Sequence, residues 1–255
     1  MNAICELLKN GAKNYNVTVF DEINSTNSYL KDNAENFKDG TVIIAKRQTA
    51  GRGRLGRSFI SERGGLYMSL LIKPSRCAEK SLYITTATAV AVAKAIETVS
   101  DKKTGIKWVN DVFIDGKKVC GILVEGMTNP KTGLLDYAVI GIGVNVYEPE
   151  NGFDGEIKDI ATSVFGKCND NGDIVRLAAE ILNQLSALLA EPHSKKTANE
   201  YRNRSIVIGK EVDIIQDGDT VSATVIDIDD DAAIILKLCN GDIIKKTSGE
   251  ISIRL

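Results

Sequence analysis

The sequence has little of the chemistry on which most metal sites and hydrolytic sites depend. It contains one histidine, His193. A single histidine argues strongly against a multi-histidine metal site or a Ser-His-Asp triad. The five cysteines are scattered and form no C-x-x-C pair, which suggests neither a disulfide framework nor a zinc knuckle; they are Cys5, Cys77, Cys120, Cys168 and Cys239. We therefore expect a reducing compartment and chemistry based on lysine, arginine, carboxylates and backbone amides, with His193 an ordinary surface residue.

An excess of charge of one sign is also lacking. Lysine and arginine total 32, aspartate and glutamate 34, and the formal net charge is −2. Such a chain has no global attraction for DNA or anionic membranes. No apolar run approaches the roughly 18 residues that span a bilayer, and Glu6 interrupts the first apolar stretch, unlike a signal peptide. We expect a cytoplasmic protein that binds neither DNA nor membrane, in which any site for a polyanion is local.

The first part of the chain predicts a sheet with a covering helix. The length of 255 residues suggests one or two domains. Apolar runs rich in β-branched residues predict strands; these are Val17–Phe20, Thr41–Gln48, Leu66–Lys73, Gly105–Val112, Val119–Met127 and Tyr137–Tyr147. The alanine-rich segment Ser81–Val99 predicts a helix over one face of the sheet. Asp115 and Gly116 form a typical two-residue hairpin turn, which makes two strands antiparallel neighbours.

The second part changes from helices to short strands. After an irregular stretch, apolar residues from Ile174 to Leu189 recur at the spacing of an amphipathic helix, and a polar helix is expected over Ser194–Arg204. Five short strands then suggest a small barrel; they are Glu211–Ile215, Val221–Ile228, Ala232–Leu238, Asp242–Thr247 and Glu250–Arg254. We place a domain boundary near residue 207, which gives domains of residues 1–206 and 207–255.

A loop rich in glycine and arginine, GRGRLGR, occupies residues 51–57, directly after a predicted strand. It matches G-x-G-x-x-G and nearly matches a P-loop, but both motifs need a helix that begins at the last glycine. Here the chain leads instead through Gly64 and Gly65 into another strand. Six basic residues and one acidic residue between Lys46 and Arg63 give a local charge of +5. This favours a phosphate-binding loop over the alternative, a solvated basic loop with turn glycines.

A second group of residues surrounds the predicted hairpin. It comprises KWVND at residues 107–111, Lys118, and GILVE at residues 121–125. A carboxylate and a lysine on opposite arms of one hairpin can converge. Asp111 could then hold Mg²⁺ on a nucleotide while Lys118 polarises an acyl oxygen. Taken alone, the same residues are also explained by an ordinary hairpin with a packing tryptophan.

Together these two segments resemble the biotin protein ligases. The family's loop G-R-G-R-x-G-R is complete at residues 51–57, and its K-W-P-N-D signature appears at 107–111 with Val109 in place of proline. Its lysine and G-I-L-V-E block match residues 118–125. Smaller matches are the Ser25-Thr26-Asn27 triplet, GIGVN at 141–145 and GEISIR at 249–254. The valine removes a backbone constraint but no functional group.

The resemblance implies an α+β fold, in which a catalytic domain like that of class II aminoacyl-tRNA synthetases precedes an SH3-like barrel. The implied catalytic domain is a mixed sheet flanked by helices. The implied reaction converts biotin and MgATP to biotinyl-5′-AMP and pyrophosphate, after which a lysine of a biotin carboxyl carrier protein attacks the mixed anhydride. No enzyme nucleophile is required, which suits a chain with one histidine. The family also implies a possible homodimer.

Three alternatives remain open at this point. A lipoate or octanoate ligase shares the acyl-adenylate chemistry but accepts another acid. A bifunctional ligase-repressor would carry a three-helix DNA-binding module, for which the segment before Ser25 is too short. A nucleotide-binding regulator without catalysis would tolerate the loss of Lys118 and Asp111, and both are present.

The resemblance also implies roles for individual residues. The biotin pocket would be formed by Ser25, Thr26, Asn27, Gln48, Gly51, Arg52, Gly53, Arg54 and Lys118. Ser25 is also a candidate helix N-cap. ATP would contact Arg54, Arg57, Asn110, Asp111, Asn145 and Arg254. Lys118, Asp111 and Arg54 would form the catalytic set, in which Lys118 binds the biotin carboxylate and then the acyl-adenylate, and Asp111 serves Mg²⁺ through the phosphates.

Overall fold

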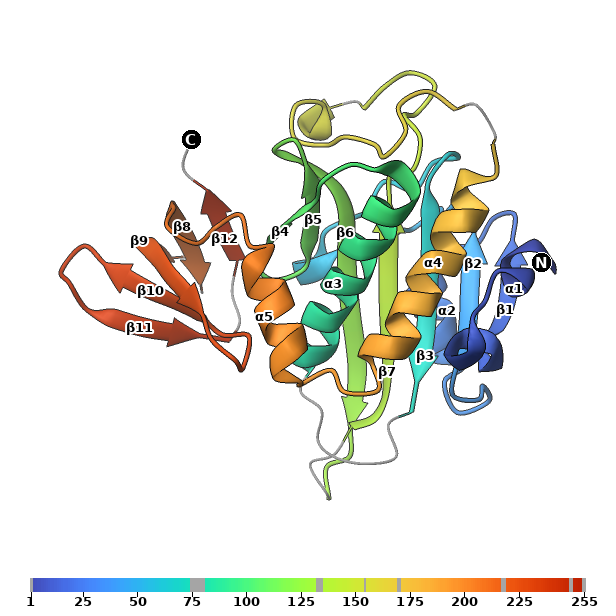
Figure 1. Cartoon of the computed structure of the whole chain (residues 1–255), viewed down its shortest axis with the longest axis horizontal. Helices are drawn as coiled ribbons and strands as arrows, with labels where there is room; N and C mark the ends of the chain where they lie inside the picture. Colours follow the sequence, from blue (N-terminus) through green and yellow to red (C-terminus); the bar gives the residue numbers. More distant parts are fainter. Residues whose placement is uncertain are drawn as a thin grey trace.

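The computed structural model contains a large mixed sheet covered by helices and a smaller antiparallel sheet beside it (Figure 1). It describes residues 2–73, 81–131, 135–153, 155–168, 171–216, 219–247 and 250–253. Helix α5 (Lys195–Asn203) is the last element before the smaller sheet, which begins at Glu211. The mixed sheet flanked by helices confirms the expected fold class, whereas the division at residues 206 and 207 stays a prediction.

The large sheet has seven strands in the order β1-β2-β3-β7-β6-β5-β4. Their bounds are β1 Asn16–Phe20, β2 Thr41–Ala45, β3 Leu66–Ile72, β4 Gly105–Lys107, β5 Asp111–Ile114, β6 Lys117–Thr128 and β7 Leu135–Val144. Strands β1 and β2 are parallel and all other neighbours are antiparallel. Strands β2 and β3 are buried on both faces, which explains why they are continuous apolar runs rather than alternating ones.

One predicted strand, Gly105–Val112, is wrong, because the chain reverses within it to form β4 and β5. The apolar residues of the turn are buried, so their pattern is that of a strand. The Trp108 indole N–H donates to the carbonyl of Ala232 at 2.9 Å, and the carbonyl of Val109 accepts from the Tyr201 hydroxyl at 3.0 Å. The turn is thus held by distant parts of the chain that no local pattern reveals.

The hairpin predicted at Asp115 and Gly116 is confirmed. It joins β5 to β6, with Ile114 opposite Lys117. Both turn residues have positive φ, 49° for Asp115 and 76° for Gly116, as a type I′ turn requires. This hairpin brings the two arms that carry Asp111 and Lys118 side by side.

Helices cover the two faces of the large sheet unequally. On one face, α3 (Ser81–Ser100) and α4 (Asp173–Leu188) lie side by side, and α5 packs against α3 (Figure 1). The short α1 (Asn2–Glu6) contacts α4. The other face carries α2 (Thr26–Asp32), whose Leu30 packs in a small separate cluster with Ile43, Leu71 and Val139. The pocket described below lies on the remainder of this second face. Three short 3₁₀ turns complete the helical elements at Asn10–Asn14, Arg54–Gly56 and Gly155–Ile157.

The expectation that no apolar run approaches the length of a membrane span is wrong, because helix α3 is long and apolar enough by length and composition alone, over Leu82–Ser100. It is, however, a core helix, since 61% of that window is buried inside the protein. Its contacts with the sheet, α4 and α5 account for its apolar character.

The smaller sheet has five antiparallel strands in the order β11-β10-β9-β8-β12. Their bounds are β8 Glu211–Gln216, β9 Asp219–Ile228, β10 Ile234–Leu238, β11 Ile243–Lys246 and β12 Glu250–Ile253. This confirms the five short strands expected there and is consistent with a small β domain. Its buried residues continue the main core of the large sheet.

Replacing Tyr201 with phenylalanine tests the link to the buried turn. Tyr201 is 1% exposed, and burial raises the pKa of its phenol, which therefore remains a donor to the Val109 carbonyl. Loss of the Tyr201 hydroxyl leaves the Val109 carbonyl without its hydrogen bond. We therefore expect Tyr201→Phe to lower the free energy of unfolding by about 1–3 kcal/mol in urea titrations. Tyr83→Phe is the control, because its hydroxyl bonds the surface carboxylate of Asp231, and it should change the value by about 0.5 kcal/mol or less. Equal effects of the two variants would contradict this account.

Candidate active site

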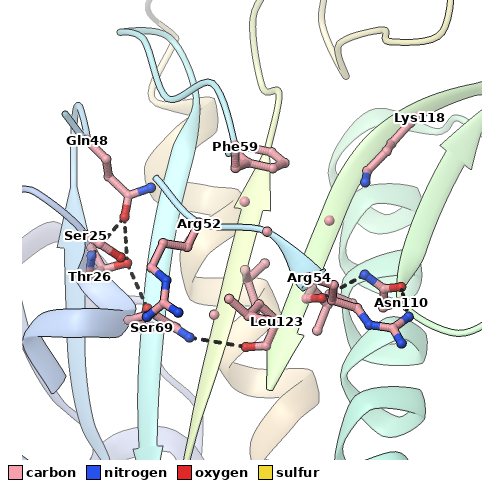
Figure 2. Close-up of a pocket in the computed structure, with 17 residues that line it drawn as sticks. Ser25, Thr26, Gln48, Arg52, Arg54, Phe59, Ser69, Asn110, Lys118 and Leu123 are labelled. Carbon is pink, nitrogen blue, oxygen red and sulfur yellow. Dashed lines mark hydrogen bonds between the residues drawn. The ribbon is translucent and has the colours of Figure 1, made fainter. Parts of the chain in front are cut away.

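A pocket of about 490 Å³ opens on the sheet face that carries α2 (Figure 2). It brings together these sequence-predicted residues: Ser25, Thr26, Asn27, Gln48, Arg52, Gly53, Arg54, Asn110 and Lys118. Sequence reasoning missed the following lining residues: Phe59, Ser69, Gly121, Ile122, Leu123, Gly141, Ile142 and Gly143. The pocket thus joins segments that are far apart in the chain.

The floor of the pocket is made of glycines on β6 and β7. Gly121 and Gly143 are cross-strand partners, and the ring of Phe59 lies against both. A Cβ atom at Gly143 would come within 2.7 Å of that ring, and one at Gly141 within 2.3 Å of Asn27 Oδ1. Glycine at alternate strand positions, as at 141 and 143, is the sequence signal that could have identified this floor.

One end of the pocket is polar and buried. Ser25, Thr26 and Asn27 are 3%, 3% and 4% exposed. The Ser25 hydroxyl oxygen accepts from the Ser28 amide at 3.3 Å, which confirms Ser25 as the N-cap of α2. The amide and hydroxyl of Thr26 lie 2.8 and 3.0 Å from Gln48 Oε1. Because the N-cap bond uses only the oxygen of Ser25, its O–H proton remains to donate to a ligand.

The glycine-rich loop is folded on itself. Phe59 N–H donates to the Gly51 carbonyl at 2.9 Å, and Gly53 N–H donates to the Arg57 carbonyl at 2.7 Å. A Cβ atom at Gly51 would lie 2.3 Å from the Phe59 carbonyl oxygen, so only glycine fits there. Gly51 does not line the pocket; it allows the loop to close on its own backbone rather than on a ligand.

The local charge of +5 is partly neutralised by carboxylates from elsewhere in the chain. Lys46 pairs with Asp21 at 2.7 Å, and Arg47 pairs with Glu22 at 2.7 Å. Arg47 also lies 3.2 Å from Glu62, the acidic residue already included in the count. The basic side chains of this segment that line the pocket are Arg52 and Arg54 (Figure 2). A net count along the sequence therefore overstates the charge that a ligand in the pocket would meet.

Lys118 lies at the end of the pocket opposite the buried polar group (Figure 2). Its Nζ is 2.8 Å from Asp111 Oδ1 across the β5–β6 hairpin. The lysine side chain bends over Gly121, where a Cβ atom would lie 3.3 Å from Nζ. Asp111 stands behind the lysine and does not itself line the pocket. The two residues converge across the hairpin as predicted, and they form an ion pair.

Arg54 connects the loop to the β4–β5 turn. Its Nη1 donates to Asn110 Oδ1 at 3.0 Å, while Asn110 Nδ2 donates to the Ile122 carbonyl at 2.9 Å. The arginine is therefore held at the pocket by a residue of the KWVND segment. The two motifs, which are separated in the sequence, meet at this contact.

The remaining predicted ATP contacts lie elsewhere. Arg57 does not line this pocket, and Asn145 lines a neighbouring hollow of about 1,430 Å³ with residues 149–153. The Asn145 amide donates to the Thr162 carbonyl at 3.1 Å. Arg254 lies outside the described residues.

Two family matches cover most of this architecture. Residues 19–145 match the biotin/lipoate A/B protein ligase family, and residues 207–254 match the biotin protein ligase C terminal domain. The first match contains the pocket segments, from β1 to the end of β7.

Named relatives and solved structures agree with these matches. The bifunctional ligase/repressor BirA of Bacillus subtilis (strain 168) is 37% identical over 177 residues, or 69% of this chain, which spans about half (54%) of that relative. The biotin–[acetyl-CoA-carboxylase] ligase of Mycobacterium tuberculosis is 31% identical over 84% of this chain and 79% of its own length. The structure of the Aquifex aeolicus biotin protein ligase in complex with biotin and ATP matches with a TM-score of 0.77 and 29% identity, over 94% of this chain and 98% of that one. Pocket, fold and matches together show that the chain belongs to the biotin protein ligase family.

Proposed function

We propose that this protein is an ATP-dependent biotin–protein ligase. It converts biotin and ATP to biotinyl-5′-AMP and pyrophosphate, and then transfers the biotinyl group to a lysine of a biotin carboxyl carrier protein. The observation that carries the proposal is a pocket with buried hydrogen-bonding groups at one end and Lys118 at the other (Figure 2). Support comes from the Aquifex aeolicus ligase, whose structure contains biotin and ATP, and from the name of the Mycobacterium tuberculosis relative.

The polar end of the pocket favours biotin over lipoate or octanoate. The ureido ring of biotin carries one carbonyl acceptor and two N–H donors, whereas a dithiolane ring or an alkyl chain carries neither. An apolar ligand would displace water from Ser25, Thr26 and Asn27 without replacing its hydrogen bonds. Sites built to hydrogen-bond a substrate reject an analogue that lacks the groups by about 10⁴–10⁵-fold. The alternative acids are therefore disfavoured on physical grounds.

Lys118 is positioned to act in both steps. With the ureido ring at the polar end, the carboxylate of biotin lies toward the ammonium group. A carboxylate oxygen attacks the α-phosphorus of ATP and pyrophosphate leaves. In the second step the carrier amine attacks the carbonyl carbon and the bond to AMP breaks, while Lys118 offsets the negative charge that develops on the carbonyl oxygen. Asp111, 2.8 Å away, holds the ammonium group in place.

We assign nucleotide binding mainly to the glycine-rich loop and to the β4–β5 turn beside it. We assign the triphosphate to Arg54 and Arg57, and further nucleotide contacts to Asn110, Asp111, Asn145 and Arg254. Among the described residues no three acidic, histidine or cysteine side chains form a metal cluster. Asp111 Oδ1 is buried and lies 2.8 Å from Lys118 Nζ, so a cation beside this carboxylate would share it with the ammonium group. We therefore assign Mg²⁺ to the ATP phosphates, with Asp111 serving it through them.

The acceptor is proposed to be the carrier domain of a biotin-dependent carboxylase, as the name of the Mycobacterium tuberculosis relative implies. The cytoplasmic location, the possible homodimer and the lack of DNA binding stay predictions from the sequence.

Isotope exchange between ATP and pyrophosphate tests the proposed function. We expect exchange in the presence of Mg²⁺ and biotin, and none with lipoate, with octanoate or without an acid, because only an acyl-adenylate makes the first step reversible. Exchange with lipoate instead of biotin would preserve the adenylation chemistry and overturn the substrate. Exchange with none of the acids would contradict ligase activity.

Replacing Lys118 with alanine tests the role of its charge. Since the ammonium group stabilises developing negative charge, we expect Lys118→Ala to slow both adenylation and transfer by about 10²–10³-fold. Lys117→Ala is the matched control, because Lys117 is the preceding, exposed lysine of the same strand. The two half-reactions are measured separately, by exchange and by transfer from synthetic biotinyl-5′-AMP. Adenylation by Lys118→Ala within about tenfold of the unmodified enzyme would rule out this role.

A further inference from the structure

The carboxylate of Glu125, on β6, lies beside the pocket. Three side chains contact this carboxylate. Asn27 Nδ2 donates to its Oε2 at 3.0 Å, Lys31 Nζ lies 2.7 Å from Oε1, and Arg52 Nη2 lies 3.5 Å from Oε1. Burial alone would raise the pKa of the Glu125 carboxyl, but the hydrogen bonds from Lys31 and Asn27 and the charge of Arg52 lower it overall. The group is therefore ionised at neutral pH. It does not itself line the pocket.

This carboxylate determines which way the amide of Asn27 faces. Asn27 Oδ1 lies 2.8 Å from the Ser69 hydroxyl, which donates to it, and Nδ2 faces Glu125. Because an ionised carboxylate only accepts hydrogen bonds, the nitrogen and not the oxygen of the amide must be on its side. The second N–H of Asn27 has only a long contact, 3.5 Å, to the Leu123 carbonyl. This orientation leaves Asn27 with an N–H that can donate to a carbonyl oxygen in the pocket.

The same carboxylate connects the glycine-rich loop to the sheet at Arg52. The other end of the loop is held by hydrogen bonds, since Ser61 Oγ donates to the Phe59 carbonyl at 2.9 Å and accepts from Gln48 Nε2 at 2.9 Å. Through Glu125 at one end and Gln48 at the other, both sides of the loop are tied to the polar end of the pocket. Hydrogen-bond networks of this kind hold their members in a defined arrangement.

We infer that Glu125 is a positioning residue for the acyl substrate. It sets the Asn27 amide with an N–H toward the ligand and holds Arg52 across the mouth of the pocket. This role rests on the proposed function, because the group that would accept the hydrogen bond from Asn27 is the ureido carbonyl of biotin. An ion pair as exposed as that with Lys31, at 35% and 20% exposure, contributes little to folding stability, so the effect falls on binding.

Glu125→Gln is the decisive variant because it keeps the shape of the side chain and removes one acceptor. A glutamine amide accepts hydrogen bonds at its oxygen and donates them at its nitrogen. Its N–H₂ must therefore face either Asn27 or the charged groups of Lys31 and Arg52. No rotamer preserves the whole network. We expect biotin affinity, measured by calorimetry, to fall by about tenfold to a hundredfold. The KM for ATP in the exchange reaction should stay within about twofold of that of the unmodified enzyme, because Glu125 lies at the acyl end of the site.

Lys31→Met is the matched control. It removes the shortest ion pair of the same carboxylate but touches neither Asn27 nor Arg52, and biotin affinity should change by about twofold or less. Thermal unfolding of each variant, followed by circular dichroism, separates a loss of binding from a loss of folded protein. Biotin affinity of Glu125→Gln within about twofold of normal, or an equal loss in Lys31→Met, would overturn the positioning role.

A swapped pair distinguishes positioning from simple structural support. In Glu125→Gln with Asn27→Asp, the glutamine N–H₂ faces a carboxylate that still accepts from Ser69, so the bond between the two positions is restored. The pocket then lacks the N–H of Asn27, and we expect biotin binding to remain weak. Recovery of binding in the swapped pair would show that only the internal bond matters. If the unmodified protein binds no biotin, the proposed function fails first, and the role of Glu125 fails with it.

Discussion

The absence of side chains at three positions of β6 and β7 is the constraint on which the site depends. Gly141 leaves room for the buried amide of Asn27, Gly143 for the ring of Phe59, and Gly121 for the bend of Lys118 toward Asp111. A methyl group at any of them would meet an atom that is held by its own contacts. The pocket is therefore formed mainly where β6 and β7 carry no side chains.

Distant parts of the chain hold Asn110 and Asp111 in position. Asn110 and Asp111 follow the buried turn at Trp108 and Val109, and that turn is hydrogen-bonded to Ala232 and Tyr201. Helix α5 and the connection between β9 and β10 thus support the carboxylate that holds Lys118, although neither Tyr201 nor Ala232 lines the pocket. This arrangement gives the C-terminal part of the chain a physical role in the position of Lys118.

Much of this could be predicted from the sequence, where the causes are local. The glycine turn at Asp115 and Gly116 and the N-cap at Ser25 follow from backbone chemistry, and both are confirmed. The reversal inside Gly105–Val112 could not be predicted, because its turn residues are apolar and are stabilised by partners about a hundred residues away in the chain. The neutralisation of Arg47 by Glu22 has the same origin, since a count of charge along the chain contains no tertiary contacts.

In the proposed reaction, biotin is activated as a non-covalent adenylate and no enzyme nucleophile is needed. The most direct measurement incubates the protein with biotin and MgATP without a carrier, removes free small molecules by gel filtration, and identifies by mass spectrometry what stays with the protein. We expect intact protein mass, biotinyl-5′-AMP released on denaturation, and disappearance of that adenylate when a biotin carboxyl carrier domain is added and becomes biotinylated. A covalent biotinyl adduct on the enzyme, or no adenylate at all, would contradict it.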